Sequence, residues 1–297
     1  MNIKKAMMSL AEPVINPATK FILKRHYNRK KNLTPLEPSK HVLILAPHMD
    51  DETIGLGGTI YEYKQHNTIV HCAFITDGAS SNGEVKRADL SAVRKKEIDQ
   101  VKDLLGIHHI YYLDTPDGQV KGNIQTEQAL NRLVQDIQPE VIYTTGFVDA
   151  HPDHVATAEL LSRVLKQNPG LNPLIRQYEI NCPVPPDEIN CIIDISSSFP
   201  VKKEATKLFK SQIIAFDGFL VLSKVKSQLL KNSSPAYVET FIQSSREEFI
   251  SQTEQLETRA YAYHSLFKQA NRTVTLLWAI YKNIKLKKKI YNERTGL

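Results

Sequence analysis

The residues best suited to do chemistry in this chain lie in two short clusters. The first cluster is the stretch APHMDDE at residues 46–52, which directly follows the apolar run VLIL. The second cluster is the stretch HPDH at residues 151–154, which follows the apolar run VIY. A catalytic zinc ion takes three imidazole or carboxylate ligands at ~2.0–2.2 Å and keeps one position open. His48 and Asp51 could therefore share a zinc ion whose third ligand comes from the second cluster.

Each cluster alone also fits a simpler structural role at the start of a helix. Carboxylates in the first turn of a helix complement its dipole and cap its free N–H groups. Here, however, both clusters follow predicted strands and both open predicted helices. Together they supply two or three histidines and several carboxylates, which suits a catalytic zinc site. The pair of clusters therefore favours a metal site over two unrelated helix caps.

The two clusters belong to an alternation of predicted strands and helices. Short apolar runs predict strands at residues 42–45, 69–75, 110–113, 141–144, 174–180 and 191–195. Apolar residues recur at helical spacing over residues 90–105 and 155–165. This alternation predicts an α/β fold with a mostly parallel sheet flanked by helices. In a Rossmann-like strand order the first and fourth strands are neighbours, and ligands bind beyond their carboxyl ends. Both clusters follow these two strands, so the fold should bring them together.

The two clusters and several shorter motifs, in the same order along the chain, resemble the PIG-L/LmbE family of zinc-dependent N-deacetylases, which act on N-acetylglucosamine-type sugars. The supporting motifs are TDG at residues 76–78, Arg94 with Glu97, LG at 105–106, PDG at 116–118, Asp194, Lys203 with Ala205, and SQ at 211–212. Two positions depart from the family pattern. Met49 stands where the family usually has proline, and Lys210 stands where it often has an aromatic residue or histidine.

The resemblance implies a Rossmann-like (LmbE-like) fold and a division of the chain into three parts. The deacetylase domain should span residues 39–245. A basic N-terminal extension, residues 1–38, precedes it, and a helical basic C-terminal extension, residues 246–297, follows it. The implied reaction is zinc-dependent hydrolysis of the acetamide of an N-acetylated amino sugar, which releases acetate. The alternative is a non-catalytic metal- or nucleotide-binding module of the same fold.

Roles for the cluster residues follow from the resemblance together with their chemistry. His48, Asp51 and His154 are expected to hold one zinc ion per chain, for which Fe²⁺ or Co²⁺ could substitute. Asp50 is expected to act as general base, because it lies beside a ligand without being one. His151, as an imidazolium, would stabilise the oxyanion of the reaction.

The remaining polar residues of these motifs have supporting roles. Asp153 would orient His151, although a helix cap is an equally good explanation for it. Glu52 is expected to hydrogen-bond a ligand or the loop amides. Arg94, Asp77 and Asp117 are candidates for contacts with the substrate, with loop capping as the alternative.

A dinucleotide-binding domain is the main rival for this fold, because the stretch GLGG at residues 55–58 is rich in glycine and Asp77 ends the next predicted strand. The glycine spacing does not match the dinucleotide fingerprint. In addition, the acidic residues 50–52 would face the pyrophosphate at the turn where such domains offer free N–H groups. The glycines therefore predict close packing of a helix on its neighbours.

The composition is that of a globular protein, with 41% hydrophobic and 24% charged residues among 297. The three cysteines are an odd number without metal-type spacing, which predicts buried thiols in a reducing compartment. The sequence contains no recognisable signal peptide and no apolar run of the ~20 residues that a transmembrane helix needs. A cytoplasmic location is expected.

The basic residues of the chain gather at its two ends. Residues 1–38 hold eight basic and two acidic residues and residues 268–297 hold eight and one, so that the ends carry +6 and +7. Since the whole chain carries +6, residues 39–267 carry −7. Helices packed on the core are the simpler interpretation of these ends, and peripheral contact with the inner face of an anionic membrane is the second. No nucleic-acid-binding motif accompanies the charge, so no nucleic-acid partner is expected.

Overall fold

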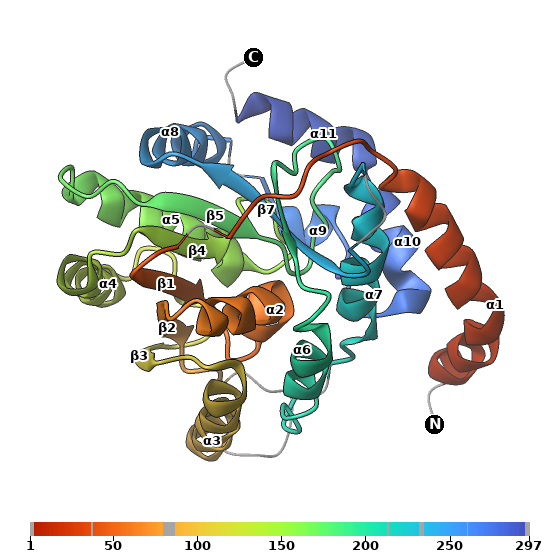
Figure 1. Ribbon diagram of the computed structural model, residues 1–297, viewed down its shortest axis with the longest axis horizontal. Coiled ribbons are helices and arrows are strands. Elements are labelled where there is room, and N and C mark those ends of the chain that lie inside the picture. The colour runs from red at the N-terminus through yellow and green to blue at the C-terminus, as the bar shows by residue number, and fades with distance from the viewer. Residues whose placement is uncertain are drawn as a thin grey trace.

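A seven-stranded sheet forms the centre of the computed structural model, which describes residues 3–36, 38–79, 87–212, 214–231, 235–259 and 261–294 (Figure 1). The strands are β1 (His41–Ala46), β2 (Ile69–Thr76), β3 (His109–Thr115), β4 (Val141–Thr145), β5 (Leu174–Tyr178), β6 (Cys191–Asp194) and β7 (Val238–Ser244). Their order in the sheet is β3-β2-β1-β4-β5-β7-β6. The first five strands along the chain pair in parallel, whereas β7 runs antiparallel to both β5 and β6. The expected mostly parallel α/β sheet is confirmed, including the neighbouring positions of β1 and β4.

Six of the seven strands lie where apolar runs predicted them, and β7 was not predicted. Its sequence VETFIQS interrupts the apolar residues with polar ones, yet six of its seven residues are buried. Glu239 is buried because it accepts hydrogen bonds from the N–H groups of Gly58 (3.0 Å) and Thr59 (2.7 Å) and pairs with Lys202 at 2.5 Å. A buried charge with satisfied partners breaks the apolar pattern from which a central strand is recognised.

Helices cover both faces of the sheet (Figure 1). They are α1 (Ile3–His26), α2 (Asp51–Gln65), α3 (Arg87–Leu105), α4 (Ile124–Ile137), α5 (Pro152–Gln167), α6 (Phe199–Thr206), α7 (Asp217–Val225), α8 (Arg246–Glu257), α9 (Tyr263–Leu266), α10 (Thr273–Tyr281) and α11 (Ile284–Glu293). A short 3₁₀ helix, Lys226–Leu229, follows α7. No helix within the described residues is long and apolar enough to cross a membrane.

Both basic ends of the chain pack on the core. Leu23 of α1 and Tyr27, which directly follows that helix, are fully buried, and so are Leu276 and Ala279 of α10. Helix α1 contacts α10 and α7, and the two terminal segments lie side by side at one side of the molecule (Figure 1). The simpler interpretation of the ends, as helices packed on the core, is confirmed. The boundaries at residues 39 and 245 stay a prediction.

The glycines of α2 are required by close packing, as the sequence predicted. A Cβ atom on Gly55 would lie 2.3 Å from the ring of Tyr178, and one on Gly58 would lie 2.8 Å from Ile195. The hydroxyl of Tyr178 donates to the carbonyl of Leu45 at 2.7 Å, which holds the ring in place. The two glycines thus let α2 pack directly against Tyr178 at the end of β5 and Ile195 just after β6.

Gly55→Ala should therefore destabilise the protein. Overpacking of a core costs ~1–3 kcal/mol, and the better helix propensity of alanine returns at most ~1 kcal/mol. We expect the free energy of unfolding, measured by urea denaturation, to fall by ~1–2 kcal/mol. Gly170→Ala is the matched control, because no heavy atom lies within 4 Å of a Cβ there. Equal stability of the Gly55 variant and wild type would show that the Tyr178 ring moves aside.

A candidate metal centre between two strand ends

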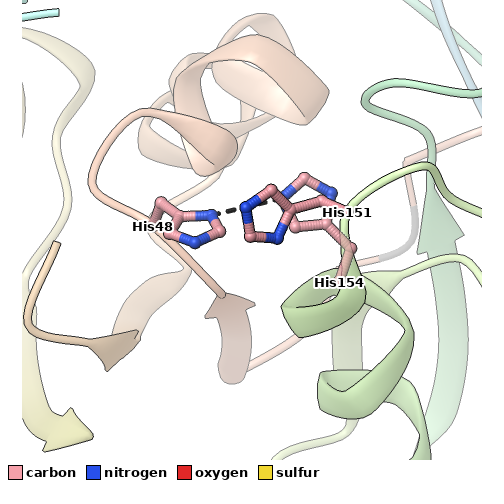
Figure 2. A group of neighbouring side chains, drawn as sticks. All are labelled: His48, His151 and His154. Carbon is pink, nitrogen blue, oxygen red and sulfur yellow. Dashed lines mark hydrogen bonds between the residues drawn. The ribbon is translucent and has the colours of Figure 1, made fainter. Parts of the chain in front are cut away.

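The two clusters meet because β1 and β4 are adjacent parallel strands. The loop after β1 carries His48 and leads into α2, which begins at Asp51. The loop after β4 leads into α5, with His151 as the N-cap residue and a proline as its first helical residue. Prolines are favoured at that position because the N–H they lack has no partner there. Figure 2 shows the rings of His48, His151 and His154 gathered between these elements.

Three donor atoms form a nearly equilateral triangle. Nδ1 of His48 lies 3.2 Å from Oδ2 of Asp51 and 3.2 Å from Nε2 of His154, and the last two atoms are 3.3 Å apart. A tetrahedral ion with ligands at ~2.0–2.1 Å has ligand atoms ~3.3–3.4 Å apart. The triangle therefore has the size of one face of a zinc tetrahedron, and these donors fit such an ion.

Other groupings of the same residues are looser. Ring nitrogens of His48, His151 and His154 lie within 4.8 Å of one another, as do donor atoms of His48, Asp117, His151 and Asp153. In the second grouping Oδ2 of Asp153 lies 4.0 Å from Nδ1 of His151, which is more than the ~3.3–3.4 Å between ligand atoms of a zinc ion. The triangle with Asp51 is the better match.

The charges around the triangle favour a cation. Five aspartates approach the three imidazoles: Asp50, Asp51, Asp117, Asp149 and Asp153. Burial opposes the charged form of His154, but Asp51 and Asp149 outweigh it and raise its pKa to about 10. Burial likewise opposes protonation of His48, and the carboxylates of Asp117, Asp153 and Asp51 raise its pKa well above the usual range. The rings of His48 and His154 thus favour a proton in a place where the carboxylates would equally stabilise a divalent ion.

Asp149 is a member of the centre that the sequence did not reveal. Its Oδ1 lies 3.1 Å from Nδ1 of His154, the ring nitrogen opposite the triangle. The backbone and side-chain N–H groups of Asn181 and the backbone N–H of His151 donate to Asp149 at 2.8–3.0 Å. A carboxylate on the second nitrogen of a metal-binding histidine fixes its tautomer and orientation. The position of Asp149 two residues before His151 is the feature of the sequence that could have indicated this role.

Asp50 lies beside the triangle with its carboxylate uncommitted. It is buried, and within the described chain no group donates a hydrogen bond to its side chain. Burial and the neighbouring charge of Asp51 raise its pKa to about 7. It lines a cavity of about 250 Å³ together with His48, Asp51, His151 and His154. A carboxylate held in this way can accept a proton inside the cavity.

The carboxylate of Asp153 lies near both His151 and His48. The Asp153 carboxylate lies 4.0 Å from Nδ1 of His151, and that nitrogen instead accepts a hydrogen bond from the backbone N–H of Asp153 at 3.3 Å. The carboxylate accepts from the N–H of Gly118 at 2.8 Å and lies 3.5 Å from Nε2 of His48. It is therefore placed to orient His48, because it faces the ring nitrogen that points away from the triangle.

The ring of His151 is also less basic than an imidazolium requires. Burial and the charges of His48 and His154 lower its pKa to about 4. Since its Nδ1 accepts a hydrogen bond, the proton of the neutral ring belongs on Nε2. A neutral ring can still donate that proton in a hydrogen bond, so stabilisation of an oxyanion by His151 does not require the imidazolium.

The other predicted polar residues divide into cavity-lining and loop-holding groups. Arg94 and Asp117 line the cavity. Arg94 donates to the carbonyl of Gly78 and to Gln212 and shows no contact with Glu52 among the described residues. Asp77 accepts hydrogen bonds from the N–H groups of Ala79 and Asp117 and is not among the residues that line the cavity. These contacts agree with the loop-capping alternative for Asp77.

Glu52 and several unforeseen residues complete the surroundings. Glu52 is fully buried and accepts from the hydroxyl of Thr53 at 2.6 Å, and burial raises its pKa to about 8. The cavity wall also contains residues from distant segments that the sequence did not single out: Ile54, Ile180, Asn181, Ile214, Phe219, Gln269 and Asn271. Gln269 and Asn271 come from the segment just before α10, so the C-terminal extension forms part of the cavity.

Comparison with known proteins gives a family match over the part of the chain that holds the centre. Residues 43–165 match the PIG-L family, described as GlcNAc-PI de-N-acetylase. A probable N-acetyl-α-D-glucosaminyl L-malate deacetylase 2 of Bacillus anthracis is 28% identical over 143 residues, which cover 45% of this chain and 63% of the relative. The diacetylchitobiose deacetylase of Thermococcus kodakarensis is 27% identical over 194 residues, 60% of this chain and 72% of the relative.

A solved structure supports the fold. The N,N'-diacetylchitobiose deacetylase from Pyrococcus horikoshii superposes with a TM-score of 0.58 at 23% identity and covers 84% of this chain and 95% of its own. At this level of identity the likeness concerns the fold and leaves the chemistry to be argued from the site.

The centre should bind one divalent ion per chain, and Asp149 should set its affinity. His154→Ala removes a corner of the triangle and should abolish stoichiometric binding of zinc to the metal-stripped protein, measured by isothermal titration calorimetry. Asp149→Asn keeps all three donors but weakens the hold on the His154 ring, so the affinity should fall ~10–100-fold. Asp136→Asn is the matched control, because that carboxylate is exposed on α4 and does not line the cavity. Unchanged affinity in Asp149→Asn, with unchanged thermal stability, would contradict its role.

Proposed function

The chain carries a PIG-L family domain over residues 43–165, and from this premise we propose that it is a zinc-dependent hydrolase that deacetylates an N-acetylated amino sugar. The observation that carries the proposal is the triangle of His48, Asp51 and His154 with the uncommitted carboxylate of Asp50 beside it. A binding module needs the triangle but has no use for a free buried base. The named relatives are deacetylases of glucosamine-type sugars, which agrees with this reading of the site.

The proposed reaction hydrolyses a linear amide. The oxygen of water bonds to the acetyl carbonyl carbon, the C–N bond breaks, and its electron pair stays on the nitrogen, which takes a proton. The products are acetate and the free amino sugar. Zinc bound by His48, Asp51 and His154 would polarise the carbonyl and make water a stronger acid.

Asp50 is the proposed general base and then general acid. Its buried carboxylate lies in the cavity next to the donor triangle and accepts no hydrogen bond from the residues that the structure describes. It can take the proton of the attacking water and give it to the leaving nitrogen, so that the step leaves Asp50 unchanged. Removing such a group typically costs a factor of ~10²–10⁴ in rate.

His151 is the proposed donor to the developing oxyanion. The backbone N–H of Asp153 fixes its Nδ1 as an acceptor, which leaves the Nε2 proton free to donate within the cavity. A preorganised donor aimed at developing charge stabilises the transition state more than the ground state. The remaining cavity wall supplies groups that can hydrogen-bond sugar hydroxyls, among them Arg94, Asp117 and Asn181.

We also propose that the protein works in a reducing compartment such as the cytoplasm. Cys72, Cys182 and Cys191 are buried free thiols, which suits such a compartment. Peripheral contact with an anionic membrane, the second interpretation of the basic ends, stays a proposal as well.

A panel of acetylated sugars tests the function. The zinc-loaded protein should remove one acetyl group from an N-acetylglucosamine conjugate, seen as the corresponding mass loss with release of an equal amount of acetate. N-acetylglucosaminyl malate and diacetylchitobiose belong in the panel, because relatives are named for them. Stripping the metal should stop the reaction and zinc should restore it. If no panel member loses an acetyl group while zinc binds stoichiometrically, the binding-module alternative is favoured.

Asp50→Asn should separate the base from the metal centre. The substitution is nearly isosteric and cannot take a proton, so kcat should fall at least ~100-fold, while zinc content measured by elemental analysis stays at the wild-type level. Asp136→Asn, which changes an exposed carboxylate of α4, again serves as control and should leave kcat within a few fold. Near-normal turnover of zinc-loaded Asp50→Asn would assign Asp50 a structural role.

A further inference from the structure

A groove between α1, α6 and α7 is rimmed by lysines and floored by apolar side chains. It has a volume of about 400 Å³, and its rim carries Lys20 and Lys24 of α1, Lys203 of α6 and Lys224 of α7. Phe199 and Tyr237 stack in its floor with their ring centroids 3.6 Å apart. These residues come from four separate segments, so the groove exists only because the N-terminal helix packs on the core.

The four lysines carry uncompensated charge. Among the described residues, no carboxylate lies within ion-pairing distance of their ammonium groups, whereas Lys207, which directly follows α6, pairs with Glu204 at 2.7 Å. Lys224 lies 5.8 Å over the ring of Tyr237, which is a contact and not a neutralising partner. Four unpaired cations around an apolar floor complement a ligand that is both anionic and apolar.

The exposed side of α1, next to the groove, also combines apolar and basic side chains. Thr19 and Leu23 lie on its buried side, and the helical period of 3.6 residues turns Val14 and Phe21 to the opposite side. These two side chains are 76% and 56% exposed. Lys20 and Lys24 lie between the buried side and the exposed stripe, so the groove borders it directly.

Helix α10 extends the apolar stripe on the other side of α1. Trp278 and Tyr281 are 54% and 41% exposed. Tyr281 contacts the ring of His26, the last residue of α1, through its hydroxyl at 3.1 Å. Lys268 lies over Trp278, and Arg25 lies over Phe21 at 4.3 Å. The two ends of the chain thus build one surface in which cations flank exposed aromatic rings.

We infer that this surface docks the protein on an anionic lipid bilayer. We call it the basic face and define it by Lys20, Lys24, Lys203, Lys224, Phe21 and Trp278. The lysines complement lipid phosphates, and the exposed aromatic rings suit the boundary between headgroups and acyl chains, where such amphipathic surfaces insert. A nucleic acid would match the charge but not the exposed Val14 and Phe21.

The basic face shares elements with the catalytic cavity. Helix α7 places Phe219 in the cavity wall and Leu220 and Val221 in the groove. Asn271, at the cavity, lies two residues before the start of α10. The basic face and the cavity are therefore built on shared elements, and the inference of membrane docking does not depend on the proposed function.

Tryptophan fluorescence tests docking without any measurement of activity. Trp278 is the single tryptophan of the chain, so its emission reports on the basic face alone. Vesicles of phosphatidylglycerol and phosphatidylcholine should shift the emission to shorter wavelength and sediment the protein. Vesicles of phosphatidylcholine alone, or inorganic phosphate, should do neither. Raising the salt concentration should weaken binding, because exposed charges are screened.

Paired substitutions test the assignment of the lysines. A basic residue near an anionic surface contributes a factor of about five to partitioning, so Lys20→Gln with Lys24→Gln should weaken vesicle binding about thirtyfold. Lys96→Gln with Lys102→Gln on α3 removes the same charge elsewhere and should change binding little. Substitution is preferable to deleting residues 1–38, because Leu23 and Tyr27 belong to the core.

Three results would overturn the inference. The first is that the wild-type protein stays in the supernatant with anionic vesicles at low salt. The second is an equal loss of binding in the control pair, which would reduce the effect to net charge. The third is binding to anionic vesicles without a change in Trp278 emission, which would place the contact on another surface. Circular dichroism of each variant keeps these outcomes separate from misfolding.

Discussion

The parallel pairing of β1 with β4 is the constraint on which the rest of the structure depends. The three donors of the metal triangle come from residues 48, 51 and 154, and their atoms must lie ~3.3 Å apart for a tetrahedral ion. His48 and His154 are 106 residues apart in the chain. Only a rigid scaffold can place their ligand atoms with that precision. The register Val42 to Val141 and Ile44 to Tyr143 sets the two strand ends beside each other, and each strand is followed at once by a short loop and a helix start. Gly55 then lets α2 pack against the ring of Tyr178, whose hydroxyl donates to Leu45 near the end of β1.

The scaffold also has to stabilise an unusual density of charge. Buried carboxylates are costly unless they are paired or hydrogen-bonded. Asp51 accepts from the backbone N–H of His48, Asp153 from that of Gly118, and Asp149 from Asn181 and His151. Asp50 stands out because nothing comparable supports it within the described residues. Because the carboxylate of Asp50 is not used in such hydrogen bonds, it is the one most available for proton transfer. The proposed role of general base is therefore assigned to Asp50 and not to its neighbours.

The sequence predicted those features that repeat a local pattern. Six strands, the helices after both clusters, the adjacency of β1 and β4 and the packing role of the glycines all follow from periodicity and residue type. The features it did not predict depend on pairing across the fold. Strand β7 carries Glu239, whose partners Gly58 and Lys202 are distant in sequence. In the sequence Asp149 looks like an ordinary loop aspartate, and only the fold places it against His154. The carboxylate of Asp153 lies closer to His48 than to His151, its near neighbour in sequence. The backbone N–H of Asp153 already donates a hydrogen bond to His151.

The separation of charge along the chain connects the centre with the basic face. A site that holds a divalent ion among aspartates requires an acidic core, and residues 39–267 carry −7. A core of that sign is repelled by an anionic bilayer over roughly a Debye length of ~8–10 Å. The terminal segments, residues 1–38 and 268–297, carry +13 between them. Part of that charge is paired with the core, since Arg29 and Lys288 pair with Asp187 and Arg294 pairs with Glu188. Lys20 and Lys24 of α1 instead border the groove, so the acidic cage can be retained while another surface of the same molecule attracts an anionic bilayer.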